Sequence, residues 1–148
     1  MARVEWIARL SDNELSFDKV KAEQWLDKVA HIHKRVLGRL TYIFVDDDEI
    51  LEVNKKYLGH DYYTDIITFD DTLGRCISGT MFISMDTVRS NALQVAHCPV
   101  GDELRRVIVH GVLHLCGIND KGPGEREVME RFENQALDIL KSDPKNAF

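Results

Sequence analysis

The sequence predicts an α+β fold: a small mixed β-sheet of about four strands, flanked by helices. The first observation is the composition. A chain of 148 residues with 44% hydrophobic and 30% charged residues suits one globular domain over 1–148. The second is that short β-rich runs alternate with segments of helical periodicity. The third is a pair of runs, 65–69 and 76–84, around a polar loop with Gly74, which favours an antiparallel hairpin.

The N-terminal segment predicts a strand followed by a long helix. Residues 3–9 alternate in part between apolar and polar side chains, as a half-buried strand does. Ser16 or Asp18 supplies a cap for a helix to about Leu37, and Gly38 is expected to end it. The buried face of this helix is expected to comprise Val20, Trp25, Leu26, Val29, Ile32 and Val36.

The next segment predicts a central strand and a capped helix. Residues 40–45 form an almost wholly apolar, β-rich run, which is typical of a strand covered on both faces. Asp46 and Glu49 have capping-box spacing and open a helix through Tyr57. The acidic run 46–49 favours this helix start over a calcium loop, because the glycine and distal glutamate of an EF-hand are missing.

Three helices are expected after the hairpin. The first is capped by Ser84 or Asp86 and runs to about Ala96. Its inward residues are expected to be Val88, Leu93 and Val95. The second is expected to be capped by Asp102, and the third spans about 125–140 with an apolar stripe.

The second of these helices carries two histidines that predict a metal site. His110 and His114 lie four residues apart in an apolar run, so their rings share one helix face about 40° apart. Gly117 can adopt a positive φ and reverse the chain, which can bring Asp120 back to the same point. Two imidazoles and one carboxylate with a fourth position open are typical of a catalytic zinc site. We therefore expect a zincin-like helix with His110, His114 and Asp120 as ligands.

The residue after the first histidine argues against a zinc peptidase. The pattern His-x3-His-x2-Gly-x2-Asp has metzincin ligand spacing, but Gly111 stands where the protease motif has its general base, a glutamate. Cys116 follows His114 by two residues and therefore points about 200° away, so we expect it to pack as a small apolar residue. The three cysteines are too widely spaced for a disulfide framework and indicate a reducing cytoplasm.

Charge and hydropathy limit the partners. A net charge of −6 argues against a general nucleic-acid coat protein but allows a local basic patch. Candidate patches are Lys28, His31, His33, Lys34, Arg35 and Arg39, then Lys55 and Lys56, then Arg105 and Arg106. No apolar run is long enough to span a membrane, and the first residues lack a secretory signal, so a cytoplasmic protein is expected.

Three blocks of the sequence resemble the YbeY family of metal-dependent endoribonucleases. His110–Gly117 reads His-Gly-Val-Leu-His-Leu-Cys-Gly, which is similar to the family block His-Gly-x-Leu-His-Leu-x-Gly. Residues 54–58 with 64–69 are similar to its Asn-x-x-Tyr and Thr-Asp-Val-Leu-Ser-Phe segments. Residues 79–84 resemble Gly-Asp-Ile-x-Ile-Ser. The order of elements also fits along nearly the whole chain.

The chain departs from the family pattern at three positions. Asp120 stands where the family has a third histidine ligand, Leu58 where it has an arginine, and Thr80 where it has an acid. The resemblance implies one Zn²⁺ per chain, and a carboxylate in the third position still binds zinc. Asp65 is a candidate supporting residue, and the sequence assigns no general base or other catalytic residue.

The implied function is hydrolysis of single-stranded RNA in ribosomal RNA processing, including maturation of the 16S 3′ end and ribosome quality control. The implied partners are ribosomal RNA and the ribosome or its assembly factors, with no membrane and no DNA. Two alternatives stay open: a metal-dependent hydrolase of another substrate, and a non-catalytic ribosome-associated module with a structural metal. An open coordination position favours an enzyme, and a fourth protein ligand favours the structural role.

Overall fold

The computed structural model describes residues 3–10, 17–60 and 64–142. Its sheet has four strands in the order β1-β2-β4-β3. The strands are β1 (Val4–Ala8), β2 (Val36–Val45), β3 (Ile66–Asp70) and β4 (Cys76–Ser84). β1, β2 and β4 run parallel, and β3 pairs with β4 in the opposite direction. The predicted mixed sheet and the hairpin are both confirmed.

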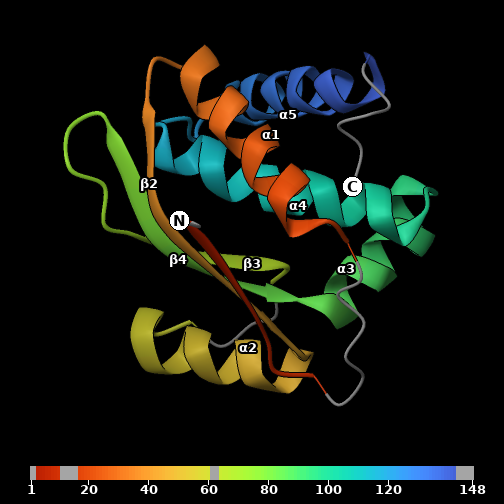
Figure 1. The fold of residues 1–148 in the computed structure, drawn as a ribbon. Coiled ribbons are helices and arrows are strands. Elements are labelled where there is room, and N and C mark those ends of the chain that lie inside the picture. The colour runs from red at the N-terminus through yellow and green to blue at the C-terminus, as the bar shows by residue number, and fades with distance from the viewer. Residues whose placement is uncertain (1–2, 11–16, 61–63, 143–148) are drawn as a thin grey trace.

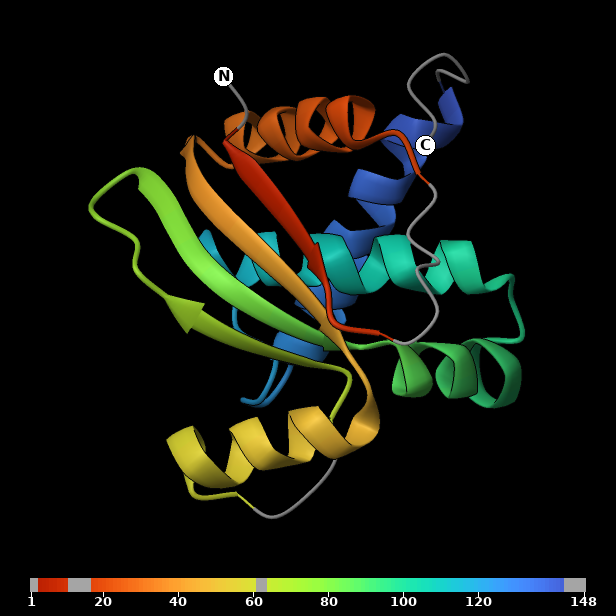
Figure 2. The same cartoon turned by 60° about the horizontal axis from the view of Figure 1, so that its bottom comes forward.

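Helices cover the two faces of the sheet unequally (Figures 1 and 2). One face carries α1 (Lys19–Ile32), α4 (Val100–Leu115) and α5 (Glu125–Ser142). The other carries α2 (Asp47–Val53), which continues into a π-helical turn, η1 (Asn54–Leu58). α3 (Met85–Asn91) follows β4 and ends in a second π turn, η2 (Ala92–Ala96). Within the described ranges, no helix combines the length and apolar composition needed to cross a membrane.

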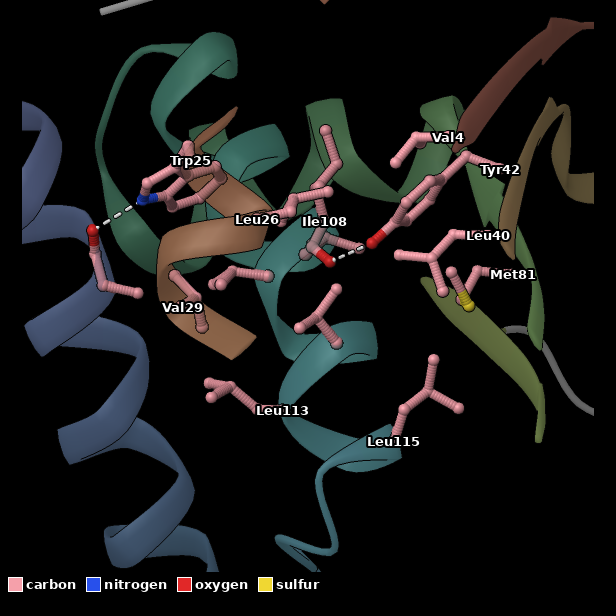
Figure 3. Packing of buried hydrophobic residues seen from close by; sticks show 14 of the residues in the cluster. Val4, Trp25, Leu26, Val29, Leu40, Tyr42, Met81, Ile108, Leu113 and Leu115 are labelled. Carbon is pink, nitrogen blue, oxygen red and sulfur yellow. Dashed lines mark hydrogen bonds between the residues drawn. The ribbon is translucent and has the colours of Figure 1, made fainter. Parts of the chain in front are cut away.

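The main core lies between the sheet and the helices α1, α4 and α5. Two buried hydrogen bonds cross it (Figure 3). The hydroxyl of Tyr42 on β2 donates to the carbonyl of Ile108 on α4 at 2.7 Å. The indole of Trp25 on α1 donates to the carbonyl of Ala136 on α5 at 2.9 Å. These bonds tie α4 to the sheet and α5 to α1. A smaller cluster under α2 fills the opposite face, so the predicted two-sided burial of 40–45 is confirmed.

The predicted first helix was too long. Asp18 caps α1 as expected, accepting from the backbone N–H of Lys21, whereas Ser16 lies outside the described residues. The helix ends at Ile32 because Lys34 adopts φ 61° and reverses the chain without a glycine. Val36 and Gly38 therefore belong to β2. Val20 and Ile32 are exposed, and so is Val36, whereas Trp25, Leu26 and Val29 are buried as predicted.

Two further helix predictions need correction. Ser84 caps α3 and Val88 is buried, but Leu93 and Val95 are each 73% exposed. The π turn η2 inserts an extra residue into the helical period and turns these two side chains outward. Asp102 does not cap α4, because Pro99 holds that position and Asp102 lies in the first turn, where its carboxylate accepts from Arg105 at 3.1 Å. The cap at Asp46 is confirmed by its 2.9 Å bond from the Glu49 N–H.

Candidate metal centre

The predicted return of the chain after α4 places one carboxylate against one histidine. α4 ends at Leu115, and Gly117 follows with φ 96°, the left-handed conformation that the sequence predicted. After this turn, Asp120 Oδ2 lies 3.2 Å from His110 Nε2. Two donors of a tetrahedral zinc site, each at about 2.0–2.1 Å from the ion, lie about 3.3 Å apart. The pair is therefore spaced as two ligands of one ion.

A second carboxylate contacts the other ring nitrogen of His110. Glu133 on α5 places Oε2 2.7 Å from His110 Nδ1. Metal-binding histidines commonly donate their second N–H to a carboxylate, so this bond leaves Nε2 for the side of Asp120. Burial alone lowers the pKa of His110, but the hydrogen bond and charge of Glu133 and the charges of Asp120 and Asp65 outweigh it and raise that pKa.

The third predicted ligand, His114, is not grouped with His110 and Asp120. It is partly buried on α4, one turn beyond His110 on the same helix face. No three His, Cys, Asp or Glu side chains in the described part of the chain form a group that could hold a metal ion. The structure thus brings together two of the three predicted ligands, His110 and Asp120, and leaves His114 beside them on the helix.

A cavity of about 670 Å³ adjoins His110 and Asp120. Its charged lining is mainly acidic and comprises Asp65, Glu103, Asp120, Glu130 and Glu133 against Arg106, Arg126 and His110. Desolvation raises the pKa of Asp65, and desolvation with the charge of Asp65 raises that of Glu103. A cavity with this surplus of carboxylates attracts cations and repels a phosphate unless a cation is bound.

The structure also explains why glycine follows the first histidine. A Cβ at Gly111 would lie 3.0 Å from Met81 Cγ and 3.2 Å from Ile66 Cδ1, where α4 packs on the sheet. Gly111 is buried, so a glutamate there would press against these side chains and would start inside the helix–sheet packing. The absence of the protease base is therefore built into the helix–sheet packing.

Gly111→Ala is expected to destabilise the protein by about 1–3 kcal/mol through overpacking, despite the better helix propensity of alanine. Gly101→Ala in the same helix is the matched control, since its Cβ would meet only the flexible end of Arg105, at 3.2 Å. It is expected to be neutral or up to about 1 kcal/mol stabilising. Urea denaturation of both variants measures the difference, and equal effects would show that Gly111 is not enclosed.

Two arginines of the predicted basic patches make hydrogen bonds within the fold and are not free on an exposed surface. Arg35 donates to the carbonyls of Gly74 and Cys116, at 3.0 and 3.1 Å, and so fixes the end of α4. Arg106 bonds to the side chains of Glu133 and Asn134, at 2.9 and 2.7 Å. Lys28, Lys55 and Lys56 remain exposed, as does Arg39. Cys116 is buried, as predicted for a packing residue, and burial raises the pKa of its thiol to about 11.

Sequence reasoning missed Glu133 as a residue of this site, and it named Arg106 only as part of a candidate basic patch. Arg106 precedes His110 by four residues and so shares its helix face, which was a usable signal. Glu133 lies beside the apolar stripe of the last helix, and only the packing of α5 on α4 brings it to His110. Asp65, named as a supporting residue, does line the cavity.

Comparisons with known proteins agree with one another. A family model described as Endoribonuclease YbeY matches residues 8–141. A Parabacteroides distasonis protein named Endoribonuclease YbeY is 58% identical over 130 residues, covering 87% of this chain and 91% of that protein. One of the same name from Phocaeicola vulgatus is 59% identical over 122 residues, covering 82% and 88%. The solution structure of TM1509 from Thermotoga maritima has a similar fold, with TM-score 0.62, 22% identity, and coverage of 98% and 96%.

Proposed function

The chain belongs to the YbeY family, and from that premise we propose that it is a metal-dependent endoribonuclease that cleaves single-stranded RNA. The relatives' shared name supports the reaction class. We further propose that the substrate is ribosomal RNA, that the protein acts in 16S 3′ end maturation and ribosome quality control in the cytoplasm, and that one Zn²⁺ binds per chain.

One observation supports this function most strongly: His110 Nε2 and Asp120 Oδ2 face each other at 3.2 Å beside an acidic cavity. The chemistry of the donors suits a zinc ion: His110 and Asp120 would be two ligands, and His114, one helical turn further along α4, would move in as the third. Bound zinc would supply a Lewis acid for a phosphoryl oxygen and would activate a water molecule. The adjoining cavity of about 670 Å³ supports a catalytic over a structural role, because a structural site is closed by protein ligands.

The chain's own residues then orient the substrate. Arg126 lies in the first turn of α5, is exposed and lines the same cavity, so its guanidinium can bind a phosphate oxygen. Arg106 is less available to bind a phosphate oxygen, because its terminal nitrogens already bond to Glu133 and Asn134. The carboxylates of the cavity would repel RNA before the cation binds, which makes metal binding a condition for substrate binding.

Asp120→Ala tests the ligand that departs from the family pattern. It is expected to lower zinc affinity about 10- to 100-fold or more, and cleavage of a single-stranded RNA with it. Asp120→His supplies a different zinc ligand and is expected to retain both. Zinc titration and cleavage of a single-stranded RNA and its matched duplex measure these effects. Full affinity in Asp120→Ala would remove Asp120 from the site, and equal cleavage of both RNAs would contradict single-strand specificity.

A further inference from the structure

We propose that Glu133 is a positioning residue that holds the His110 ring in the one tautomer able to bind a metal through Nε2. The metal-binding part of this inference rests on the proposed function, whereas the tautomer does not. Glu133 is not one of the three predicted ligands, and membership of the YbeY family does not by itself give it a role.

Both carboxylate oxygens of Glu133 are engaged, and in different directions. Oε2 lies 2.7 Å from His110 Nδ1, and Oε1 accepts from Arg106 at 2.9 Å. The side chain is buried, with Glu133 only 8% exposed, so water competes little for either oxygen. A carboxylate held at both oxygens cannot rotate away from the imidazole, and its bond to the ring has a fixed direction.

Arg106 extends this fixed arrangement across two helices. It lies one turn before His110 on α4, and its second terminal nitrogen donates to Asn134 Oδ1 at 2.7 Å on α5. The side chains of Glu133, Arg106 and Asn134 thus form what we call the α4–α5 clamp. The clamp joins α4, which carries His110, to α5, whose residues also line the cavity, and its bond to Nδ1 orients the imidazole ring.

The chemistry of the carboxylate decides the tautomer. An ionised carboxylate only accepts hydrogen bonds, so Nδ1 must carry the proton in the 2.7 Å contact. Nε2 also faces a carboxylate, that of Asp120, but at 3.2 Å, so in the neutral ring the shorter contact with Glu133 keeps the proton on Nδ1 and leaves the lone pair on Nε2. A simple structural ion pair between Glu133 and Arg106 would account for one oxygen but not for the second oxygen on the imidazole. The geometry therefore points to a role in preparing the ligand.

The test compares Glu133→Gln with Glu130→Gln. Both variants remove one carboxylate charge from α5 and from the same cavity, but only Glu133 bonds to His110. Glu133→Gln is expected to lower zinc affinity about 10- to 100-fold, and Glu130→Gln by less than about threefold. Glu133→Asp keeps the charge but shortens the side chain, so it is expected to lose affinity too. Equal losses in the two glutamine variants, or full affinity in Glu133→Asp, would reduce the effect to cavity charge and overturn the proposal.

A second readout needs no metal and no activity. Nitrogen NMR of the metal-free protein, at a pH where the ring is neutral, is expected to show His110 protonated at Nδ1 in the wild type and a tautomer mixture in Glu133→Gln. The same tautomer in both proteins would overturn the positioning role. If the wild type shows the expected tautomer but His110 binds no zinc, the proposed function fails while the positioning role stands. Thermal melts confirm that each variant is folded.

Discussion

The His110→Ala/His114→Ala double variant is expected to purify with almost no zinc, against about one ion per wild-type chain. Removing both imidazoles leaves Asp120 as the only predicted ligand, and one carboxylate does not retain zinc through purification. Because the metal contributes several kcal/mol to such reactions, RNA cleavage is expected to fall about a thousandfold or more. Elemental analysis and cleavage of a single-stranded RNA measure the two losses.

Cys116→Ala is the control for this variant. Cys116 adjoins the end of α4 and is a potential metal ligand by chemistry, but it is buried in the core. Its replacement is expected to leave the zinc content unchanged. Zinc retained by the double-histidine variant, or released by Cys116→Ala alone, would show that the predicted ligand set is wrong.

Trp25→Ala is expected to lower the free energy of unfolding by about 3–5 kcal/mol. The side chain is fully buried between α1 and the rest of the core, and its indole donates to the Ala136 carbonyl. The substitution leaves a cavity and removes the hydrogen bond that ties α1 to the Ala136 carbonyl on α5. With about 2–4 °C lost per kcal/mol for a chain of this size, the melting temperature should fall by roughly 10 °C.

This variant also links the core to the site. Ala136 lies three residues after Glu133 on α5, so loosening the contact with α1 is expected to disturb the α4–α5 clamp and weaken zinc binding in the folded fraction. Trp25→Phe keeps much of the packing and should be intermediate. Val20→Ala, at an exposed position of the same helix, should change stability by no more than about 0.5 kcal/mol. A similarly small effect of Trp25→Ala would contradict the buried placement of the indole.

Periodicity and capping residues were sufficient to predict most of the fold. The apolar run 40–45 became the core of β2, and Asp18, Asp46 and Ser84 each cap the helix that follows them. These signals are local, because the cap bonds to a backbone N–H three residues away. Two-sided burial likewise appears in a strand's own composition.

The errors arose where no local residue type marks the geometry. Lys34 adopts a positive φ that sequence reasoning reserves for glycine or asparagine, so the end of α1 was placed too late. The π turn at Ala92–Ala96 shifts the helical period without a signature residue, and it reversed the expected faces of Leu93 and Val95. Such features depend on the packing around them.

The candidate site likewise has one part that local spacing predicted and one part that depends on tertiary packing. The spacing of His110, His114, Gly117 and Asp120 predicted the turn after α4, and the structure places Asp120 against His110. Glu133 lies 23 residues after His110, and its role depends on how α5 packs against α4. Contacts between helices of this kind are set by tertiary structure, and one sequence does not contain a pattern that reports them.

The most direct test of a metal-dependent endoribonuclease is RNA cleavage by the wild-type protein before and after its metal is removed. A chelator-treated, folded protein is expected to lose cleavage of a single-stranded RNA, and to regain it when about one equivalent of zinc is restored. Undiminished cleavage by protein shown to contain no metal would contradict the central claim.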